Sequence, residues 1–296
     1  MEIYAPSGLR CEARPFKGRE IMAIVEALEE TESMGNDAML ELLNGTWLST
    51  LDVGPYAKLE GAERKPNWQS EVVKNDLLGL LLSLRVGSFP DGHLYEFPVR
   101  CEGPGCRHRI IWGCNITEHI LSRVRELPEP GRRYLESGEP IVHNVAGTEV
   151  RFRLPTLQSE VPMLKWIKQM RKRKGPDGRK ARRTRKQTVI DRMAAQIIGL
   201  EFNGVVQKPT VPRAHAFVMD LDAPDLYDLR EAMDLADVQI DSEITVKCDE
   251  CDWEFETDIP LTQSFLDPGI LGRRARWFGH LDAEPELASQ SETQTS

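Results

Sequence analysis

Two stretches of this chain decide its fold: FPVRCEGPGCRHRIIWGCNI at residues 97–116 and ITVKCDECDWEFETDIPL at residues 244–261. Each consists of an alternating apolar stretch, a pair of cysteines and a second alternating stretch, with an aromatic residue soon after the second cysteine. Alternation of this kind predicts a β-hairpin with one buried face. The likeness of the two stretches suggests that each half of the chain ends in such a hairpin, although it does not by itself establish a duplication.

The cysteines in these stretches have the spacing of metal ligands. Two residues separate the later pair, which is the usual spacing in a tight turn, and four residues separate the earlier pair, with Gly103-Pro104-Gly105 as a flexible turn. Zinc prefers four thiolate or imidazole ligands in a tetrahedron, and a site with four protein ligands has no open position for catalysis. The sequence therefore predicts one structural Zn²⁺ held by Cys101, Cys106, Cys248 and Cys251.

The two pairs are far apart in the chain, with 142 residue steps from Cys106 to Cys248. Closing such a loop costs on the order of 4 kcal/mol, whereas zinc binding contributes roughly 10–16 kcal/mol in small finger peptides. The separation is therefore no objection to a shared ion. The competing interpretation is four unrelated buried thiols. His108 and Cys114 are substitute ligands for the first pair, and Cys11 is expected to be a small core residue.

Length and composition describe a globular chain. Its 296 residues are 40% hydrophobic and 29% charged, which predicts one large or two ordinary domains. The longest apolar run, from Leu77 to Leu84, is too short to cross a bilayer, and the opening residues lack the pattern of a secretory signal. We therefore expect neither a membrane nor a secreted protein. In a reducing compartment, closely spaced cysteines more often bind metal than form disulfides.

A strongly basic segment, from Lys165 to Lys186, interrupts an acidic chain. It holds 12 basic residues and one acidic residue, and the rest of the chain has 26 basic and 46 acidic residues. A turn at Gly175-Pro176-Asp177-Gly178 places these charges around a loop between two helices. We expect the loop to be solvated or to dock on an acidic protein surface. The alternative is contact with nucleic-acid phosphates, with Trp166 stacked on a base.

Hydrophobic periodicity predicts the other elements. Besides the two cysteine hairpins, strands are expected as a pair within 3–14 and as a hairpin within 138–154 that turns near Ala146-Gly147. Helices are expected at about 17–32, 37–50, 69–85, 160–174, 184–200 and 223–235, the last with Asp222 as its N-cap.

These elements predict an α+β fold in which helical segments surround a zinc-ribbon-like pair of β-hairpins contributed by the two halves of the chain. We divide the chain into an N-terminal α+β half with the first cysteine pair (1–157), a C-terminal helical half with the basic loop and the second pair (158–268), and a C-terminal extension that is partly disordered (269–296).

Four sequence motifs that mark common catalytic or nucleotide-binding sites do not occur in this chain, and a site assembled from scattered carboxylates is only a third, weaker hypothesis. G-x-G-x-x-G, G-x-x-x-x-G-K-S/T, H-E-x-x-H and G-x-S-x-G are all missing, and the six histidines form no pair at helical spacing. We therefore predict that the protein is not an enzyme.

Longer motifs are informative when taken together. The first half contains PSGL (6–9), PFKGRE (15–20), a GPY turn (54–56) and VRCEGPGC (99–106). The second half contains RMAAQIIGLEFNG (192–204), LDAPDLYDLREAMD (221–234) and DSEITVKCDECDWEFETDIPLTQSFLDP (241–268). This layout, which covers most of residues 3–268, resembles the baseplate-hub assembly proteins of contractile-tailed bacteriophages.

The resemblance implies a non-enzymatic structural or assembly role in a tail baseplate hub, with other baseplate, hub and tail proteins as partners. It also implies a location in the virion or, during assembly, in the host cytoplasm. The chain departs from the family pattern in the wider spacing of its first cysteine pair, in the basic residues 172–186 and in the extension 269–296. The alternative function is a zinc-ribbon nucleic-acid-binding protein that uses residues 165–186.

Overall fold

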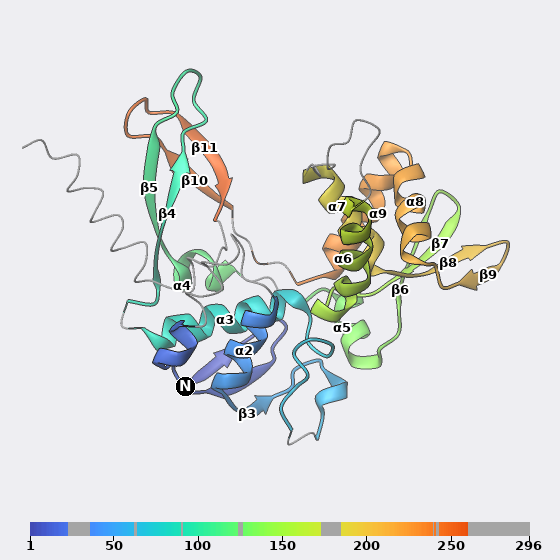
Figure 1. Ribbon diagram of the computed structural model, residues 1–296, viewed down its shortest axis with the longest axis horizontal. Coiled ribbons are helices and arrows are strands. Elements are labelled where there is room, and N and C mark those ends of the chain that lie inside the picture. The colour runs from blue at the N-terminus through green and yellow to red at the C-terminus, as the bar shows by residue number, and fades with distance from the viewer. Residues whose placement is uncertain are drawn as a thin grey trace, which may run out of the picture.

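The computed structural model describes residues 1–22, 36–61, 64–89, 91–123, 127–172, 185–238, 240 and 243–259. These ranges contain both helices and antiparallel sheets, which confirms the predicted α+β class. The described strands form four sheets, with the orders β1-β2-β3, β4-β5, β6-β7-β8-β9 and β10-β11. In Figure 1 the two hairpin sheets stand together above α3, and the four-stranded sheet lies to the other side with α6 to α9.

The first part of the chain builds a three-stranded sheet against a long buried helix. The sheet comprises β1 (Glu2–Tyr4), β2 (Arg10–Ala13) and β3 (Trp47–Asp52), with helical residues 18–22 and α2 (Asn36–Thr46) between β2 and β3. α3 (Lys74–Ser88) follows a 3-10 turn at Ala57–Leu59 and contacts β1. Most of its side chains are buried, as its leucine-rich sequence requires.

The rest of the chain begins with the first cysteine hairpin. Its strands are β4 (Leu94–Arg100) and β5 (Arg109–Asn115), and they lead into α4 (Ile116–His119) and a 3-10 turn at Leu121–Arg123. The remaining elements are α5 (Glu129–Ser137), β6 (Ile141–Val145), β7 (Thr148–Phe152), α6 (Leu157–Lys172), α7 (Arg185–Gln196), β8 (Ile197–Phe202), β9 (Val205–Gln207), α8 (Val211–Asp220), α9 (Ala223–Ala236), β10 (Glu243–Lys247) and β11 (Glu254–Asp258).

In the first part of the chain, the pairing between β2 and β3 contains a β-bulge directly after α2. A hairpin, two helical segments and a third strand follow one another, and the third strand, β3, begins directly after α2 and pairs with β2. Two residues of β3 are skipped in the pairing, Leu51 and, nearer to α2, Leu48. The paired residues are Cys11 with Thr50, Glu12 with Ser49 and Ala13 with Trp47. The next amide, of Arg14, donates to the carbonyl oxygen of Thr46 at the end of α2 (2.8 Å).

The second part repeats this unit with the same register. β8 begins directly after α7 and pairs with β7, and Ile198 is skipped at the equivalent step. The paired residues are Val150 with Leu200, Arg151 with Gly199 and Phe152 with Ile197. The next amide, of Arg153, donates to the carbonyl oxygen of Gln196 at the end of α7 (3.1 Å). Because a bulge is a defined feature of a fold, the shared bulge identifies the two parts as structural repeats, each followed by a cysteine hairpin.

Two predicted helices end earlier than expected, and both end at this junction. α2 stops at Thr46 and α7 at Gln196, and a strand begins at the next residue in each case. Trp47 and Ile197 fit the apolar stripe of a helix, but aromatic and β-branched residues also favour strands, and pairing with β2 or β7 decides between the two. α3 begins at Lys74, five residues later than the predicted start at residue 69.

Other predicted elements agree with the structure. The strand pair within 3–14 and the hairpin within 138–154 are confirmed, and the turn residues Ala146 and Gly147 both have positive φ. α6 and α9 are present, and Asp222 occupies the N-cap position of α9, although its side chain makes no capping hydrogen bond.

The four-stranded sheet crosses the predicted boundary between the N-terminal half (1–157) and the C-terminal half (158–268). It joins β7 to β8 and therefore contains residues from both sides of that position. Strand pairing places the start of the second repeat near residue 141. Most of the predicted helix at 17–32, the centre of the basic loop (173–184) and the extension 269–296 lie outside the described residues.

The N-terminal end of α3 connects the two repeats. Asn75 Nδ2 donates hydrogen bonds to the carbonyl oxygen of Val238 (2.6 Å) and to Asp237 Oδ2 (3.2 Å), directly after α9. Lys74 Nζ lies 2.9 Å from both carboxylate oxygens of Glu160 on α6. Burial raises the pKa of Asp237 to about 7 against the opposing effect of the Val238 amide, and the negative charge of Asp76 acts in the same direction as burial.

We expect Asp237 to make the protein less stable as the pH rises from about 4 to about 7. In this window the folded protein retains the proton of Asp237 and the unfolded chain has lost it, so the folded state binds more protons and the free energy of unfolding falls with pH. Asp237→Asn should remove this contribution, roughly 1–3 kcal/mol across the window, in urea unfolding at several pH values. Asp220→Asn, at an exposed position of α8, is the control. The same pH slope in wild type and Asp237→Asn would contradict the assignment.

Candidate metal centre

The first cysteine hairpin is a two-stranded ribbon with one buried face. Tyr95, Phe97 and Val99 alternate along β4 and are buried, and they face Cys114, Trp112 and Ile110 on β5. The rings of Phe97 and Trp112 lie 5.7 Å apart between centroids. This packing gives the ribbon a fixed register up to Arg100, the residue before the first cysteine, and so fixes where the turn begins.

Backbone hydrogen bonds shape the turn that carries the first cysteine pair. The amide of Cys101 donates to the carbonyl oxygen of His108 (2.9 Å), which extends the ribbon by one pair, and the amide of Cys106 donates to the carbonyl oxygen of Gly103 (3.0 Å). The amide of Gly103 donates to the Cys101 sulfur (3.3 Å). Gly105 has a φ of +77°, a conformation that glycine adopts without strain. The four-residue spacing is therefore accommodated by an ordinary tight loop.

The second cysteine hairpin forms a shorter turn. In the ribbon of β10 and β11, Ile244 and Val246 pair with Thr257 and Phe255, and Ile244, Val246 and Phe255 are buried. The amide of Cys248 donates to the carbonyl oxygen of Trp253 (2.9 Å), and the amide of Asp252 donates to the carbonyl oxygen of Cys248 (3.0 Å).

The two turns bring the four predicted ligands together. All four sulfur atoms lie within 4.8 Å of one another. The closest pairs join the two hairpins, with 3.6 Å between the sulfurs of Cys101 and Cys251 and 4.0 Å between those of Cys106 and Cys248. These distances are far from the length of a disulfide, which is about 2.05 Å. A tetrahedron with metal–sulfur bonds of about 2.3 Å has sulfur–sulfur edges of about 3.8 Å, so the four cysteines are compatible with a four-thiolate metal site.

The close approach of the two turns depends on a glycine. A Cβ atom placed on Gly103 would lie 3.0 Å from Cβ of Trp253 on the other hairpin and 3.2 Å from the Cys101 sulfur. Both distances are shorter than ordinary van der Waals contacts. A side chain at residue 103 would therefore push the second turn away from the first. The sequence indicated Gly103 as part of a flexible turn, but contact with Trp253 depends on the fold and could not be read from the spacing.

The pKa values of two of the four thiols, Cys101 and Cys248, are shifted in opposite directions. Burial raises the pKa of Cys101 to about 12. Burial acts in the same direction on Cys248, but hydrogen bonds from the backbone amides of Cys251 and Glu250 outweigh it and lower the pKa of Cys248 to about 7. One thiolate therefore forms readily in this cluster. A bound divalent cation favours deprotonation of coordinating thiols.

The other cysteines and histidines that the sequence singled out lie outside the four-sulfur cluster. Cys11 pairs across β2–β3 with Thr50 and is buried, and Cys114 faces Tyr95 in the buried face of the first ribbon. Burial raises the pKa of both thiols to about 11. His108 Nε2 lies 3.3 Å from Asp249 Oδ1, which links the two turns outside the cluster.

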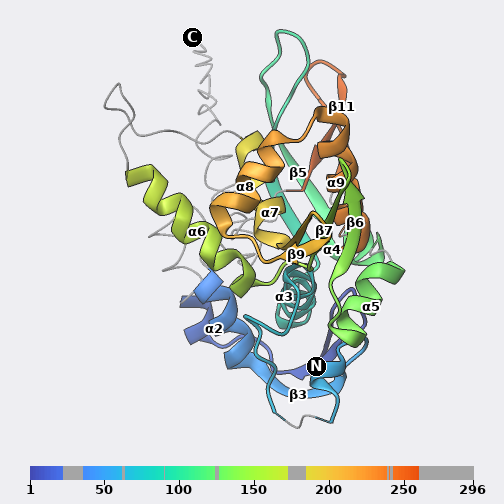
Figure 2. The ribbon, with the colours of Figure 1, turned by 90° about the vertical axis from the view of Figure 1, so that its right-hand side faces the viewer.

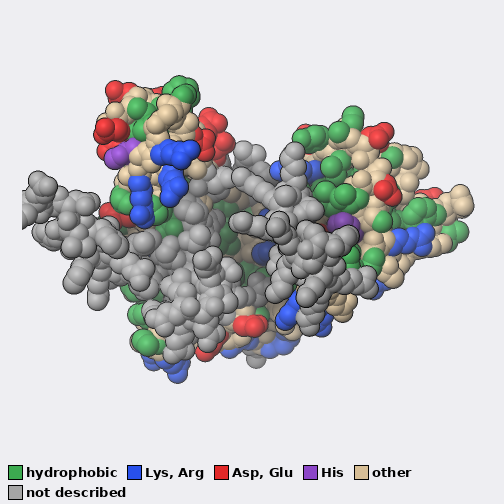
Figure 3. All heavy atoms as spheres, turned by 45° about the horizontal axis from the view of Figure 1, so that its top comes forward, with side chains coloured by type: hydrophobic (Ala, Val, Ile, Leu, Met, Phe, Trp, Pro, Cys, Tyr) green, Lys and Arg blue, Asp and Glu red, His purple; other side chains and the backbone are tan. Residues whose placement is uncertain are grey.

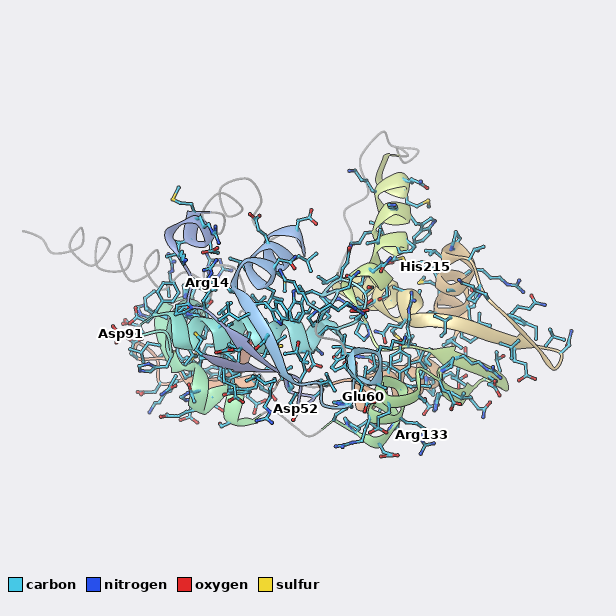
Figure 4. All side chains as sticks on the ribbon, turned by 90° about the horizontal axis from the view of Figure 1, so that it is seen from below. Arg14, Asp52, Glu60, Asp91, Arg133 and His215 are labelled. Atoms are coloured by element: carbon cyan, nitrogen blue, oxygen red, sulfur yellow. The ribbon has the colours of Figure 1, made fainter. Side chains whose placement is uncertain are left out.

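In the described part of the basic segment, the aromatic ring that was considered for stacking on a base, that of Trp166, is already packed against protein. Trp166 packs against the core, and its ring lies 4.8 Å from that of His215, measured between centroids. Figure 4 labels His215 among the helices of the second repeat. Contact with His215 occupies part of the ring that would otherwise stack on a base.

Comparison with models of known protein families found no match, and comparisons with curated proteins and with solved structures found none either. Among the described residues, no helix has the length and apolar character needed to cross a bilayer.

We expect Cys248→Ser to abolish metal binding, because three thiolates and a hydroxyl no longer form the tetrahedral set. The wild-type protein should contain one metal ion per chain by elemental mass spectrometry, and the variant none. Its melting temperature should fall by roughly 10 °C, since a change of 1 kcal/mol moves the melting temperature of a domain this size by about 2–4 °C. Cys114→Ala is the control and should retain the ion. Full metal content in Cys248→Ser would exclude the site.

Gly103→Ala should weaken metal binding without removing a ligand. The added methyl group displaces Trp253 or the Cys101 sulfur, and changes just outside the ligands typically lower metal affinity by about 10-fold to 100-fold. Competition with a chromophoric chelator measures this loss. Gly113→Ala in β5 is the matched control, because its Cβ would meet only Glu96 Cγ, at 3.8 Å. Equal affinities for the two variants would show that the turns do not need this close approach.

Proposed function

We propose that this protein is a non-enzymatic structural or assembly protein of a bacteriophage tail baseplate hub, stabilised by a structural zinc ion. The observation that carries the structural role is the convergence of two cysteine pairs from hairpins that follow different repeats. An ion held by all four sulfurs has no coordination position for a substrate, so its role is to join the hairpins. The assignment to a baseplate hub is supported by the resemblance of residues 3–268 to that family.

Zinc is the ion that best suits this donor set. Thiolates are soft ligands, and four of them in a tetrahedron are typical of zinc or of iron in iron–sulfur proteins. The joining of chain segments that are distant in sequence is a common task of structural zinc, whose binding free energy becomes folding free energy. Elemental analysis of protein purified without added metal distinguishes zinc from iron directly.

A nucleic-acid-binding function remains the alternative from the sequence, but no specific feature of the described residues favours it. The centre of its basic segment lies outside those residues, and Trp166 is packed against His215. We therefore retain the structural role as the proposal.

The baseplate proposal requires the gene for this chain to lie among phage tail genes and to be needed for tail assembly. An amber mutation in the gene should yield particles without complete tails in negative-stain electron microscopy, and should lower plaque formation by at least about 100-fold. Wild-type protein and the control Cys114→Ala should restore plaques when supplied from a plasmid, and Cys248→Ser should not. Intact, infectious particles from the amber mutant would contradict the proposal. Mass spectrometry of purified wild-type particles then separates a resident component from an assembly factor that stays in the host cytoplasm.

A further inference from the structure

The outer face of the first cysteine hairpin combines apolar side chains with unpaired arginines. Because side chains alternate along a strand, the residues between the buried ones point away from the core. On this face Arg100 lies directly opposite Arg109, and both are exposed. No carboxylate of the described residues forms an ion pair with either. Leu94 and Ile111, each about half exposed, lie on the same face. We call this surface the basic face.

Like charges directly opposite each other on a ribbon are destabilising. A partner that supplies negative charge would remove this repulsion, and the exposed apolar side chains beside the arginines would be buried by the same contact. Glu96 lies on the same face, four residues before Arg100 and opposite Gly113, and forms no ion pair with either arginine among the described residues. The basic face therefore has the chemistry of a docking site for an acidic surface.

The second cysteine hairpin has an outer face of opposite charge. Residues 243–258 contain seven acidic residues and one lysine. Glu254 and Glu256 are exposed on β11, opposite Lys247 and Thr245, and neither forms an ion pair with a cation of the described residues. Lys247 Nζ instead lies 3.2 Å from Asp252 in the turn. We call this surface, centred on Glu254 and Glu256, the acidic face.

The two faces belong to equivalent hairpins, one after each repeat, and both hairpins carry sulfurs of the same cluster. The buried side chains of both hairpins belong to a single core cluster, and the four sulfurs join their tips. Figure 2 shows the two hairpins together at the top of the molecule, and Figure 3 shows Lys/Arg and Asp/Glu side chains in separate groups on this lobe. Each face is therefore the outer surface of a two-stranded ribbon, and the two surfaces are similar in width and opposite in charge.

We infer that a second copy of this chain docks on these faces, with the basic face of one copy on the acidic face of the next. The chain itself supplies a complementary surface on the same kind of ribbon, since Glu254 and Glu256 are opposite in charge to Arg100 and Arg109. The contact is head to tail, because one face of a copy meets a different face of the next copy. Head-to-tail contacts form closed rings or open filaments. The inference rests on the two ribbons and not on the baseplate proposal.

Analytical ultracentrifugation of the full-length, metal-loaded protein tests the inference. At low salt the wild type should reach, as its concentration rises, at least twice the monomer mass of 33.6 kDa. The larger species should decrease at about 1 M salt, where charge interactions are screened within about 3 Å. The double variants Arg100→Glu/Arg109→Glu and Glu254→Arg/Glu256→Arg should each remain monomeric.

Mixing the two double variants gives the decisive result. Each variant alone carries two faces of the same charge, but every contact between the two variants joins opposite charges, so the mixture should recover the larger species. Arg132→Glu/Arg192→Glu, at exposed positions on α5 and α7, is the matched control and should associate like wild type. Metal content and circular dichroism confirm that each variant is folded.

Three outcomes would overturn the inference. The first is a wild type that stays monomeric at every concentration. The second is association that survives in both double variants, which would place the contact on another surface. The third is a mixture that stays monomeric. If a wild type that stays monomeric binds duplex DNA at low salt and Arg100→Glu/Arg109→Glu does not, the basic face binds nucleic acid instead.

Discussion

The four sulfur atoms at the tips of the two hairpins are the contact on which the arrangement of the repeats depends. An isolated two-stranded ribbon is marginally stable in water, and here each ribbon contributes its buried side chains to a shared core. Four thiols whose sulfurs lie within 4.8 Å of one another are a poor contact by themselves, and burial raises the pKa of Cys101. A divalent cation converts them into attracting ligands. A divalent cation bound at this cluster would therefore hold the two hairpins together.

A second joint lies at the N-terminal end of α3, where Asn75 holds the backbone at Val238. One point of contact would allow the repeats to rotate freely about it, whereas a second, separate contact restricts that rotation. The chain between Val238 and β10 connects the two joints, because β10 begins only five residues later. Beside this joint, Asp76 is buried and accepts hydrogen bonds from the Ser7 amide (3.0 Å) and from the hydroxyls of Ser7 and Tyr56. The start of α3 is therefore hydrogen-bonded to the first repeat through Asp76 and to the end of the second repeat through Asn75.

The sequence predicted the cysteine cluster well because ligand spacing and strand alternation are local signals. Cys248 and Cys251 could be recognised from a two-residue gap, and their meeting with Cys101 and Cys106 followed from the coordination number of zinc. The helix ends were predicted less well. Trp47 and Ile197 fit a helical stripe and a strand equally, and only pairing with β2 or β7, which is not local, decides for the strand. The same holds for the sheet that crosses residue 157 and for the contact of Gly103 with Trp253.

The repeats share the bulge beside α2 and α7 but differ in the surfaces of their hairpins, and this difference has a geometric consequence. If the outer faces of both hairpins carried the same charge, every contact between the hairpins of two copies would bring like charges together. With Arg100 and Arg109 on one ribbon and Glu254 and Glu256 on the other, the two faces of one molecule are complementary to those of the next. The angle between the faces then decides between a ring and a filament. Because the four sulfurs join the tips of the two hairpins, an ion bound there would also restrict that angle and so the shape of the proposed assembly.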